Sequence, residues 1–231
     1  MRFQTTLLPL TGLLTLTSAH FDLLQPPSRG SSHDKSTQYP CSGLPPSKNR
    51  TQIALSGPEI SIALKMGHDH SAVQVLLALG SDPGTNFNIT LVPTFGQIGL
   101  GDFCLPTVKI SEKTLGRKFS EGLEATLQVV TNGDPSGGLY NCADIVFTSK
   151  VTASAPSNSC KNGTGVSATA FSGSARSRNA NESTANGQPQ RSGSGDGNHS
   201  GQKKPKGAAA SLQAATWGVF GAAILGAAAL L

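Results

Sequence analysis

The stretch "SAVQVLLALGSDPGTNFNITLVP" covers residues 71–93 and decides the fold class. Two short segments rich in branched and aromatic residues, 73–79 and 87–92, flank a cluster of turn-forming residues at 80–84. Branched and aromatic side chains favour strands, while Gly, Pro and Asp at close spacing favour a tight connection. This pattern predicts two β-strands joined by a turn.

The same pattern continues on both sides of this stretch. Further turn clusters lie at 99–102 and 132–138, and residues 39–47, with three prolines and Cys41, predict a pinned irregular loop. Short strands at this spacing, without a segment of helical periodicity, predict an all-β fold, an antiparallel sandwich rather than βαβ units. The predicted strands are 60–64, 73–79, 87–92, 105–110, 125–130 and 139–147.

Both ends of the chain have the composition of processing signals. Residues 1–19 combine a basic residue, an apolar run and small residues before His20, which predicts a secretory signal peptide cleaved after Ala19. Residues 201–231 combine a polar spacer with an apolar tail, which predicts a GPI-anchor signal that is removed; a tail-anchored helix is the alternative. We therefore expect a GPI-anchored lipoprotein at the extracellular face of the plasma membrane or in the cell wall.

Between these ends the composition changes at Cys160. Residues 20–160 have the size of one domain. Residues 161–200 are rich in Ser, Gly and Asn and hold too few large apolar residues to offset the entropy of ordering, so they predict a disordered, glycosylated stalk. Several N-x-[ST] sequons predict a glycoprotein, and they lie at Asn49, Asn88, Asn162, Asn181 and Asn198.

Cysteines and charge narrow the class of protein further. An even number of cysteines in a secreted chain predicts two disulfides, with three possible pairings among Cys41, Cys104, Cys142 and Cys160. The formal net charge is +5, but residues 20–160 hold ten Lys and Arg against eleven Asp and Glu. The predicted domain therefore lacks the basic excess of a nucleic-acid-binding protein, and nucleic acid is not an expected partner.

Histidine is the residue type that points to chemistry in this chain. After cleavage, His20 would be the first residue and would offer two nitrogens, the α-amine and the ring Nδ1. The α-amine has an ordinary pKa of about 7.7–8.0, so it reaches the neutral, metal-binding form near physiological pH. A second histidine, from His68 or His70 in the "HDH" segment, completes the three-nitrogen arrangement called a histidine brace, which suits copper. Two exposed turn histidines are the alternative interpretation of "HDH".

Several ordered motifs give the chain a resemblance to a known family. They are "SAHFDLLQPPSRG" at 18–30, "GHDHSAVQVLLALGSDPGTNFNITLVP" at 67–93, "GLGDFCLP" at 99–106 and "GLEATLQVVTNGDPSGGLYNCADIVF" at 122–147, followed by the apolar tail. The chain thereby resembles the fungal copper proteins that are similar to lytic polysaccharide monooxygenases, the copper acquisition factor domain family. The resemblance implies a small Ig/fibronectin-III-like β-sandwich that binds one copper ion, as Cu(II) or Cu(I), in a histidine brace.

The resemblance also implies a ligand set. His20 matches the N-terminal ligand, and His68 fits the second position better than His70 because "MGH" directly precedes a predicted strand. The family adds an aspartate to the two histidines, for which Asp144 is favoured over Asp102. The alternative for Asp144 is a structural carboxylate that accepts backbone N–H bonds near a disulfide.

Three hypotheses for the function of this chain follow from these residues and from the resemblance. The first is copper acquisition or homeostasis at the fungal cell wall without oxidative catalysis, with a copper transporter or a wall glycan as a further partner. A copper-dependent polysaccharide monooxygenase acting on wall glycans is the second, and a structural or adhesion module without metal is the third. A tyrosine on the metal, for which Tyr140 is the candidate, would favour the second. A carboxylate ligand stabilises Cu(II) and favours the first.

Overall fold

The strands of the domain are 4 to 11 residues long and are joined mainly by turns and loops. The computed structural model describes residues 20–152 and 160–191. Its strands are β1 (Phe21–Gln25), β2 (Thr51–Ala54), β3 (Glu59–Met66), β4 (His70–Leu79), β5 (Ile89–Ile98), β6 (Gly101–Lys109), β7 (Leu123–Asn132), β8 (Gly138–Thr148) and β9 (Ser167–Ala170). Its short helices are η1 (His33–Lys35), α1 (Glu112–Leu115), α2 (Gly173–Ser177) and η2 (Ala180–Glu182).

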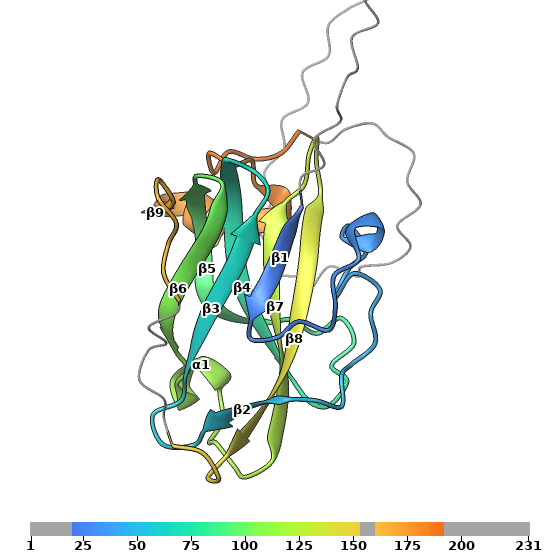
Figure 1. The fold of residues 1–231 in the computed structure, drawn as a ribbon, viewed down its shortest axis with the longest axis vertical. Helices are drawn as coiled ribbons and strands as arrows, with labels where there is room; N and C mark the ends of the chain where they lie inside the picture. Colours follow the sequence, from blue (N-terminus) through green and yellow to red (C-terminus); the bar gives the residue numbers. More distant parts are fainter. Residues whose placement is uncertain (1–19, 153–159, 192–231) are drawn as a thin grey trace, which may run out of the picture. The chain divides into compact units, whose positions relative to one another are not determined.

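The strands form two sheets that pack face to face (Figure 1). The smaller sheet has the order β1-β3-β6, and the larger has the order β2-β8-β7-β4-β5-β9. All pairs are antiparallel except β2 with β8. In β3, buried and less buried residues alternate, so one face of the strand, from Ile60 to Met66, lies against the core. The predicted all-β sandwich is confirmed.

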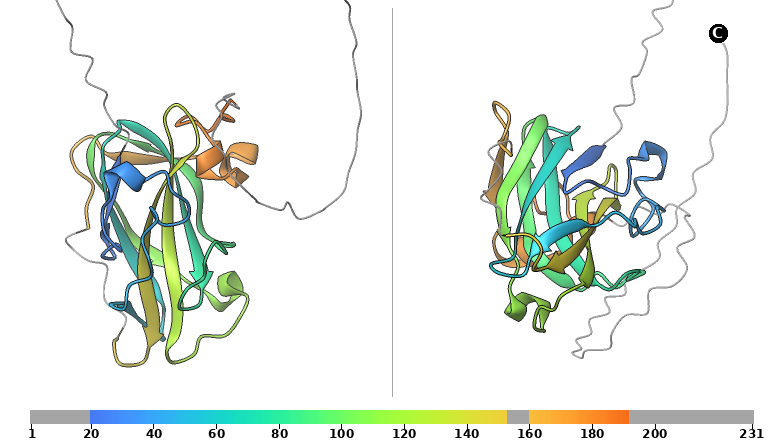
Figure 2. Two further views of the ribbon diagram at one scale, coloured as in Figure 1. Left: turned by 90° about the vertical axis from the view of Figure 1, so that its right-hand side faces the viewer. Right: turned by 60° about the horizontal axis from the view of Figure 1, so that its bottom comes forward.

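The centre of the larger sheet is covered on both faces. Every residue of β8 except Val146 is buried. One side faces the core between the sheets, while the other is covered by two segments that run across it. The loop of residues 26–50 is the first, and residues 171–191, called the C-terminal strap below, are the second (Figure 2). The strap packs Ala180 and Phe171 against Val130 and Tyr140 of the sheet.

The six predicted strands are all present, and most are longer than the sequence indicated. The predicted stalk is wrong for residues 161–191, because β9 pairs with β5 and the strap docks on the sheet. Backbone pairing holds β9, and side-chain hydrogen bonds together with Ala180 and Phe171 hold the strap. The rest of the predicted stalk, 192–200, lies outside the described residues, as do the predicted signal peptide (1–19) and GPI signal (201–231).

Two disulfides, Cys41–Cys142 and Cys104–Cys160, are present as predicted and select one of the three possible pairings. The first ties the 26–50 loop to β8, and the second ties the segment after residue 159 to β6. Among the sequons, Asn49, Asn88 and Asn162 are exposed, Asn181 is partly buried, and Asn198 lies outside the described ranges. Within those ranges, no helix has the length and apolar character needed to cross a membrane.

Candidate metal centre

The pairing of β1 with β3 brings His20 to the turn that contains His68. Phe21 lies opposite Met66 in the register, so the residue before Phe21 meets the residue after Met66. The N–H of Gly67 donates a hydrogen bond of 2.9 Å to the carbonyl of His20. A Cβ atom at Gly67 would lie 2.4 Å from that same carbonyl oxygen, which is too close for any side chain. Glycine at this position therefore lets the His20 backbone lie directly on the turn.

A small pocket opens at this end of the sandwich, and both His20 and His68 line it. Its cavity volume is about 10 Å³, which is room for roughly one water-sized atom and far too little for a sugar ring. Its other lining residues come from both sheets and are Phe21, Met66, Ser71, Thr131, Asn132, Asp134 and Leu139. The size and the two imidazoles fit a single ion.

The hydrogen bond of the His20 ring fixes which of its nitrogens carries the proton. Nε2 of His20 lies 3.0 Å from the backbone carbonyl oxygen of His33. A carbonyl can only accept, so Nε2 is the donor and Nδ1 carries the lone pair of the imidazole. Nδ1 is the nitrogen that must coordinate if the α-amine of the same residue is a second ligand. Metal-binding histidines commonly have this kind of partner on the other ring nitrogen.

His68 differs from His20 in that its ring Nε2 has no hydrogen-bond partner among the described residues. This nitrogen is also buried. Buried polar atoms in native proteins nearly always have a partner, so an unpaired ring nitrogen on a pocket calls for a ligand. Nδ1 of His20 and Nε2 of His68 thus give the pocket two imidazole nitrogens that suit a first-row transition metal.

The carboxylate on this pocket is Asp134, which sequence reasoning missed. It lies in the turn between β7 and β8, in "NGDPSGG", where aspartate has an ordinary turn-forming role. The signal that points to it is topological. Thr131 pairs with Val73, so the end of β7 lies beside the start of β4, which begins two residues after His68. A residue just past the end of β7 is thereby brought to the histidines.

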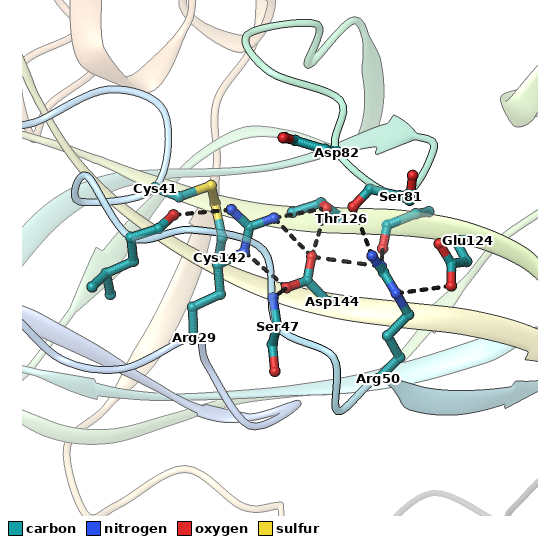
Figure 3. A network of polar contacts seen from close by, with 12 residues as sticks. Arg29, Cys41, Ser47, Arg50, Ser81, Asp82, Glu124, Thr126, Cys142 and Asp144 are labelled. Atoms are coloured by element: carbon teal, nitrogen blue, oxygen red, sulfur yellow. Dashed lines mark hydrogen bonds and ion pairs between the residues drawn. A yellow bond between two sulfur atoms is a disulfide. The ribbon is translucent and has the colours of Figure 1, made fainter.

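Asp144, the favoured aspartate ligand, is not among the residues that line this pocket. Its carboxylate is buried in a network of polar contacts between β8 and the 26–50 loop (Figure 3). It accepts hydrogen bonds of 2.7–2.8 Å from the Arg29 guanidinium, the Thr126 hydroxyl and the Ser47 N–H. Arg50 adds a second positive charge at 3.7 Å. This is the structural carboxylate that the sequence left as the alternative.

The electrostatics of Asp144 agree with a structural role. Burial by itself raises the pKa of a carboxyl group, but the hydrogen bonds from Arg29, Ser47 and Thr126 and the charge of Arg29 outweigh it. The pKa of Asp144 therefore lies below its ordinary value, and the group stays ionised as the partner of Arg29. A carboxylate whose two oxygens are already occupied in this way has no lone pair directed at a metal.

The remaining candidates lie off the pocket as well. The exposed carboxylate of Asp102 is 3.0 Å from Nζ of Lys65, and Nδ1 of the exposed His70 ring is 3.3 Å from the carboxylate of Asp69. Tyr140 points away from the pocket, because Leu139 lines it and neighbouring strand residues face opposite sides. The Tyr140 hydroxyl instead accepts a hydrogen bond of 3.2 Å from the side-chain amide of Asn181.

Side chains alone do not make a metal site here. Within residues 20–152 and 160–191, no three His, Cys, Asp or Glu side chains gather closely enough to hold an ion. A histidine brace does not need three, because one of its nitrogens is the main-chain amine of the first residue. The two imidazoles at the pocket therefore fit a brace, whose third nitrogen would come from His20 once it is the first residue, better than a site made of side chains only.

The fold is a β-sandwich with two histidines on a pocket at one end. The chain belongs to the family described as Copper acquisition factor BIM1-like, whose model matches residues 18–165. This match confirms the resemblance seen in the sequence.

Three similar proteins come from fungi. An uncharacterized protein of Aspergillus fumigatus is 57% identical over 156 residues, 68% of this chain and 64% of that protein. Lytic polysaccharide monooxygenase-like protein X325 of Yarrowia lipolytica is 33% identical over 175 residues, 72% of this chain and 63% of its own. A lytic polysaccharide monooxygenase-like protein of Emericella nidulans is 31% identical over 138 residues, 56% of this chain and 55% of its own. The chain thus spans less than two thirds of the length of each.

Proposed function

We propose that this protein binds one copper ion as cargo at the fungal cell surface, for copper acquisition or homeostasis, without oxidative catalysis. The ion is held in a histidine brace by the α-amine and Nδ1 of His20 and by Nε2 of His68, with the Asp134 carboxylate nearby. The observation that carries the proposal is the buried Nε2 of His68, which has no hydrogen-bond partner among the described residues and belongs to the pocket that His20 also lines.

The proposal requires that His20 become the first residue of the mature chain. We infer cleavage after Ala19, which creates the amine ligand, and a GPI lipid that holds the domain at the extracellular face of the plasma membrane. Release of the protein from intact cells by a phosphatidylinositol-specific phospholipase C tests the anchor. Protein that stays on the cells after complete enzyme treatment would contradict it.

Asp134 and Tyr140 support copper binding over polysaccharide oxidation. An anionic oxygen favours Cu(II) over Cu(I) and so disfavours the redox cycling that a monooxygenase requires. Tyr140, the candidate for a tyrosine on the metal, faces the strap instead. We therefore expect no oxidised oligosaccharides when the copper-loaded protein is incubated with a reductant and chitin or β-glucan. Their appearance would replace this proposal with the enzymatic one.

The decisive experiment compares two N-termini. Secreted protein that begins at His20 should bind one Cu(II), with nitrogen ligands visible by EPR. A form with one glycine before His20 has no amine in the right place, and a His68→Ala variant lacks the second imidazole. Each should bind copper more weakly by at least about 100-fold, since even the loss of a group that supports a ligand costs 10–100-fold. His70→Ala, which removes an exposed imidazole off the pocket, is the matched control and should bind normally. Equal binding by the two N-terminal forms would refute the brace.

A further inference from the structure

The C-terminal strap makes its last contact at the turn that carries Asp134. The family model ends at residue 165, before the strap begins, so the family match assigns no role to residues 171–191. In Figure 2 the orange strap lies against the larger sheet, close to the turn between β7 and β8. The side chain of Gln190 makes hydrogen bonds to this turn.

Gln190 binds both polar groups of one residue in the turn. Its Oε1 accepts a hydrogen bond of 2.6 Å from the N–H of Gly137, and its Nε2 donates one of 2.9 Å to the carbonyl of the same residue. That carbonyl also accepts the 2.9 Å hydrogen bond from the Gly133 N–H that closes the turn. Nε2 donates again, over 2.8 Å, to the carbonyl of Ser183 within the strap. The amide thus joins the turn to the strap.

The turn needs an external support of this kind. Residues 134–137 are all exposed, and Gly137 has a backbone φ of +83°, a conformation that glycine adopts at little cost. Asp134 lies between the two residues that the Gly133–Gly137 hydrogen bond joins. Fixing Gly137 therefore limits the positions that the Asp134 carboxylate can take at the mouth of the pocket.

The strap is held to the sheet by contacts that do not involve Gln190. The Ala180 N–H donates to Oε1 of Gln74 over 3.2 Å, and Asn181 bonds to the Tyr140 hydroxyl. Gly138 lies so close to the strap that a Cβ atom there would be 2.5 Å from Cβ of Asn181. Removing the Gln190 amide should therefore release the turn while the strap stays docked.

We propose that Gln190 is a positioning residue of the metal centre, which sets the place of the Asp134 carboxylate by binding the backbone of Gly137. The strap is in this way a part of the metal site and not only a connection to the rest of the chain. This role rests on the proposed function, because it assumes that Asp134 acts on the copper held by His20 and His68.

The test is a double-mutant cycle read by Cu(II) EPR and by copper titration on secreted protein that begins at His20. Gln190→Ala should weaken copper binding on the order of 10-fold and shift the EPR spectrum in the same direction as Asp134→Asn. In the Asp134→Asn background, Gln190→Ala should have no further effect, because the two residues act through one carboxylate. Gln190→Glu keeps the acceptor for the Gly137 N–H and should give an intermediate spectrum.

Gln188→Ala is the matched control, because Gln188 is an exposed glutamine on the same strap. It should bind copper and give a spectrum like that of the unaltered protein, and circular dichroism should show that all variants are folded. A spectrum that changes with Asp134→Asn but not with Gln190→Ala would refute the positioning role and leave the copper site standing. Additive effects in the double variant would refute it as well. Unaltered protein that binds no copper would instead refute the proposed function.

Discussion

Asp144 and His68 differ sharply in how their polar atoms are satisfied. Both are side chains of metal-binding type, and both have polar atoms shielded from solvent. The Asp144 carboxylate accepts four hydrogen bonds on its two oxygens and has an arginine beside it. The buried Nε2 of His68 has no partner in the part of the chain that the structure describes. The hydrogen-bonding capacity of the Asp144 carboxylate is therefore filled by the protein itself, whereas that of His68 Nε2 is not.

This difference separates structural from functional polar groups better than residue type does. A buried charge remains in a protein when a partner compensates its desolvation, and removing that partner is costly. A buried polar atom without a partner lowers stability, so an unpaired ring nitrogen on a pocket that a second imidazole also lines favours a ligand there. By this criterion Asp144 belongs to the architecture, whereas His68 has the character expected of the metal ligand proposed above.

The largest effect on stability is expected at Asp144. Asp144→Asn leaves the Arg29 guanidinium buried without its counter-charge, and breaking a buried pair of this kind costs about 3–5 kcal/mol. Urea unfolding should show this loss in the free energy of unfolding. Copper titration of the folded fraction should still give one ion per chain with nearly unchanged affinity. If instead copper is lost while stability is kept, Asp144 is a ligand and the comparison above is wrong.

The lowered pKa of Asp144 adds a pH dependence with a definite sign. Folding lowers the pKa below its ordinary value of 3.8, so the folded state binds this proton less readily than the unfolded chain does. The stabilisation is complete above about pH 3.8 and is lost as the pH falls through the lower, folded-state pKa. The difference in stability between the unaltered protein and Asp144→Asn should therefore shrink in that acidic range. A difference that stays constant down to complete acid unfolding would contradict this assignment.

Much of the fold was accessible from the sequence, because strand composition and turn residues are local signals. Which aspartate lines the pocket, in contrast, depends on contacts between residues far apart in the sequence. In β8, Leu139 faces the pocket, whereas Cys142 faces the 26–50 loop to which its disulfide runs. Asp144 is two residues beyond Cys142 and therefore shares its face, away from Leu139. Knowledge of the Cys41–Cys142 pairing would have excluded Asp144 from the pocket; with three pairings open, the sequence could not supply it.

The C-terminal strap escaped sequence reasoning for a different reason. Its composition lacks the apolar residues that normally mark a folded segment. The sheet supplies the apolar surface instead, through Val130 and Tyr140, and the strap contributes Ala180 and Phe171. The composition of a segment indicates only how much apolar surface that segment itself can bury. It therefore does not predict order in a segment that packs on apolar surface supplied by the sheet.

A smaller effect is expected at Gly67, which holds the His20 backbone against the turn. In Gly67→Ala, the new Cβ would lie 2.4 Å from the His20 carbonyl oxygen, so the backbone of one of the two must move. Such overpacking costs about 1–3 kcal/mol, and the displaced His20 should weaken copper binding on the order of 10-fold. Gly163→Ala, whose Cβ would have no neighbour nearer than 3.6 Å, is the control and should bind copper normally. Equal copper affinities of the two variants would show that His20 does not depend on this contact.

The smallest effect is expected at Asp102, the other aspartate that the sequence offered as a ligand. Its ion pair with Lys65 joins two side chains that are 60% and 55% exposed, so water screens their attraction. Asp102→Asn should therefore change the free energy of unfolding by less than about 0.5 kcal/mol and leave the copper EPR spectrum unchanged. The substitution is chemically the same as Asp144→Asn, so the gap between their effects measures what burial and a complete set of partners add to a carboxylate. A shifted EPR spectrum in Asp102→Asn would place this carboxylate, rather than Asp134, at the metal.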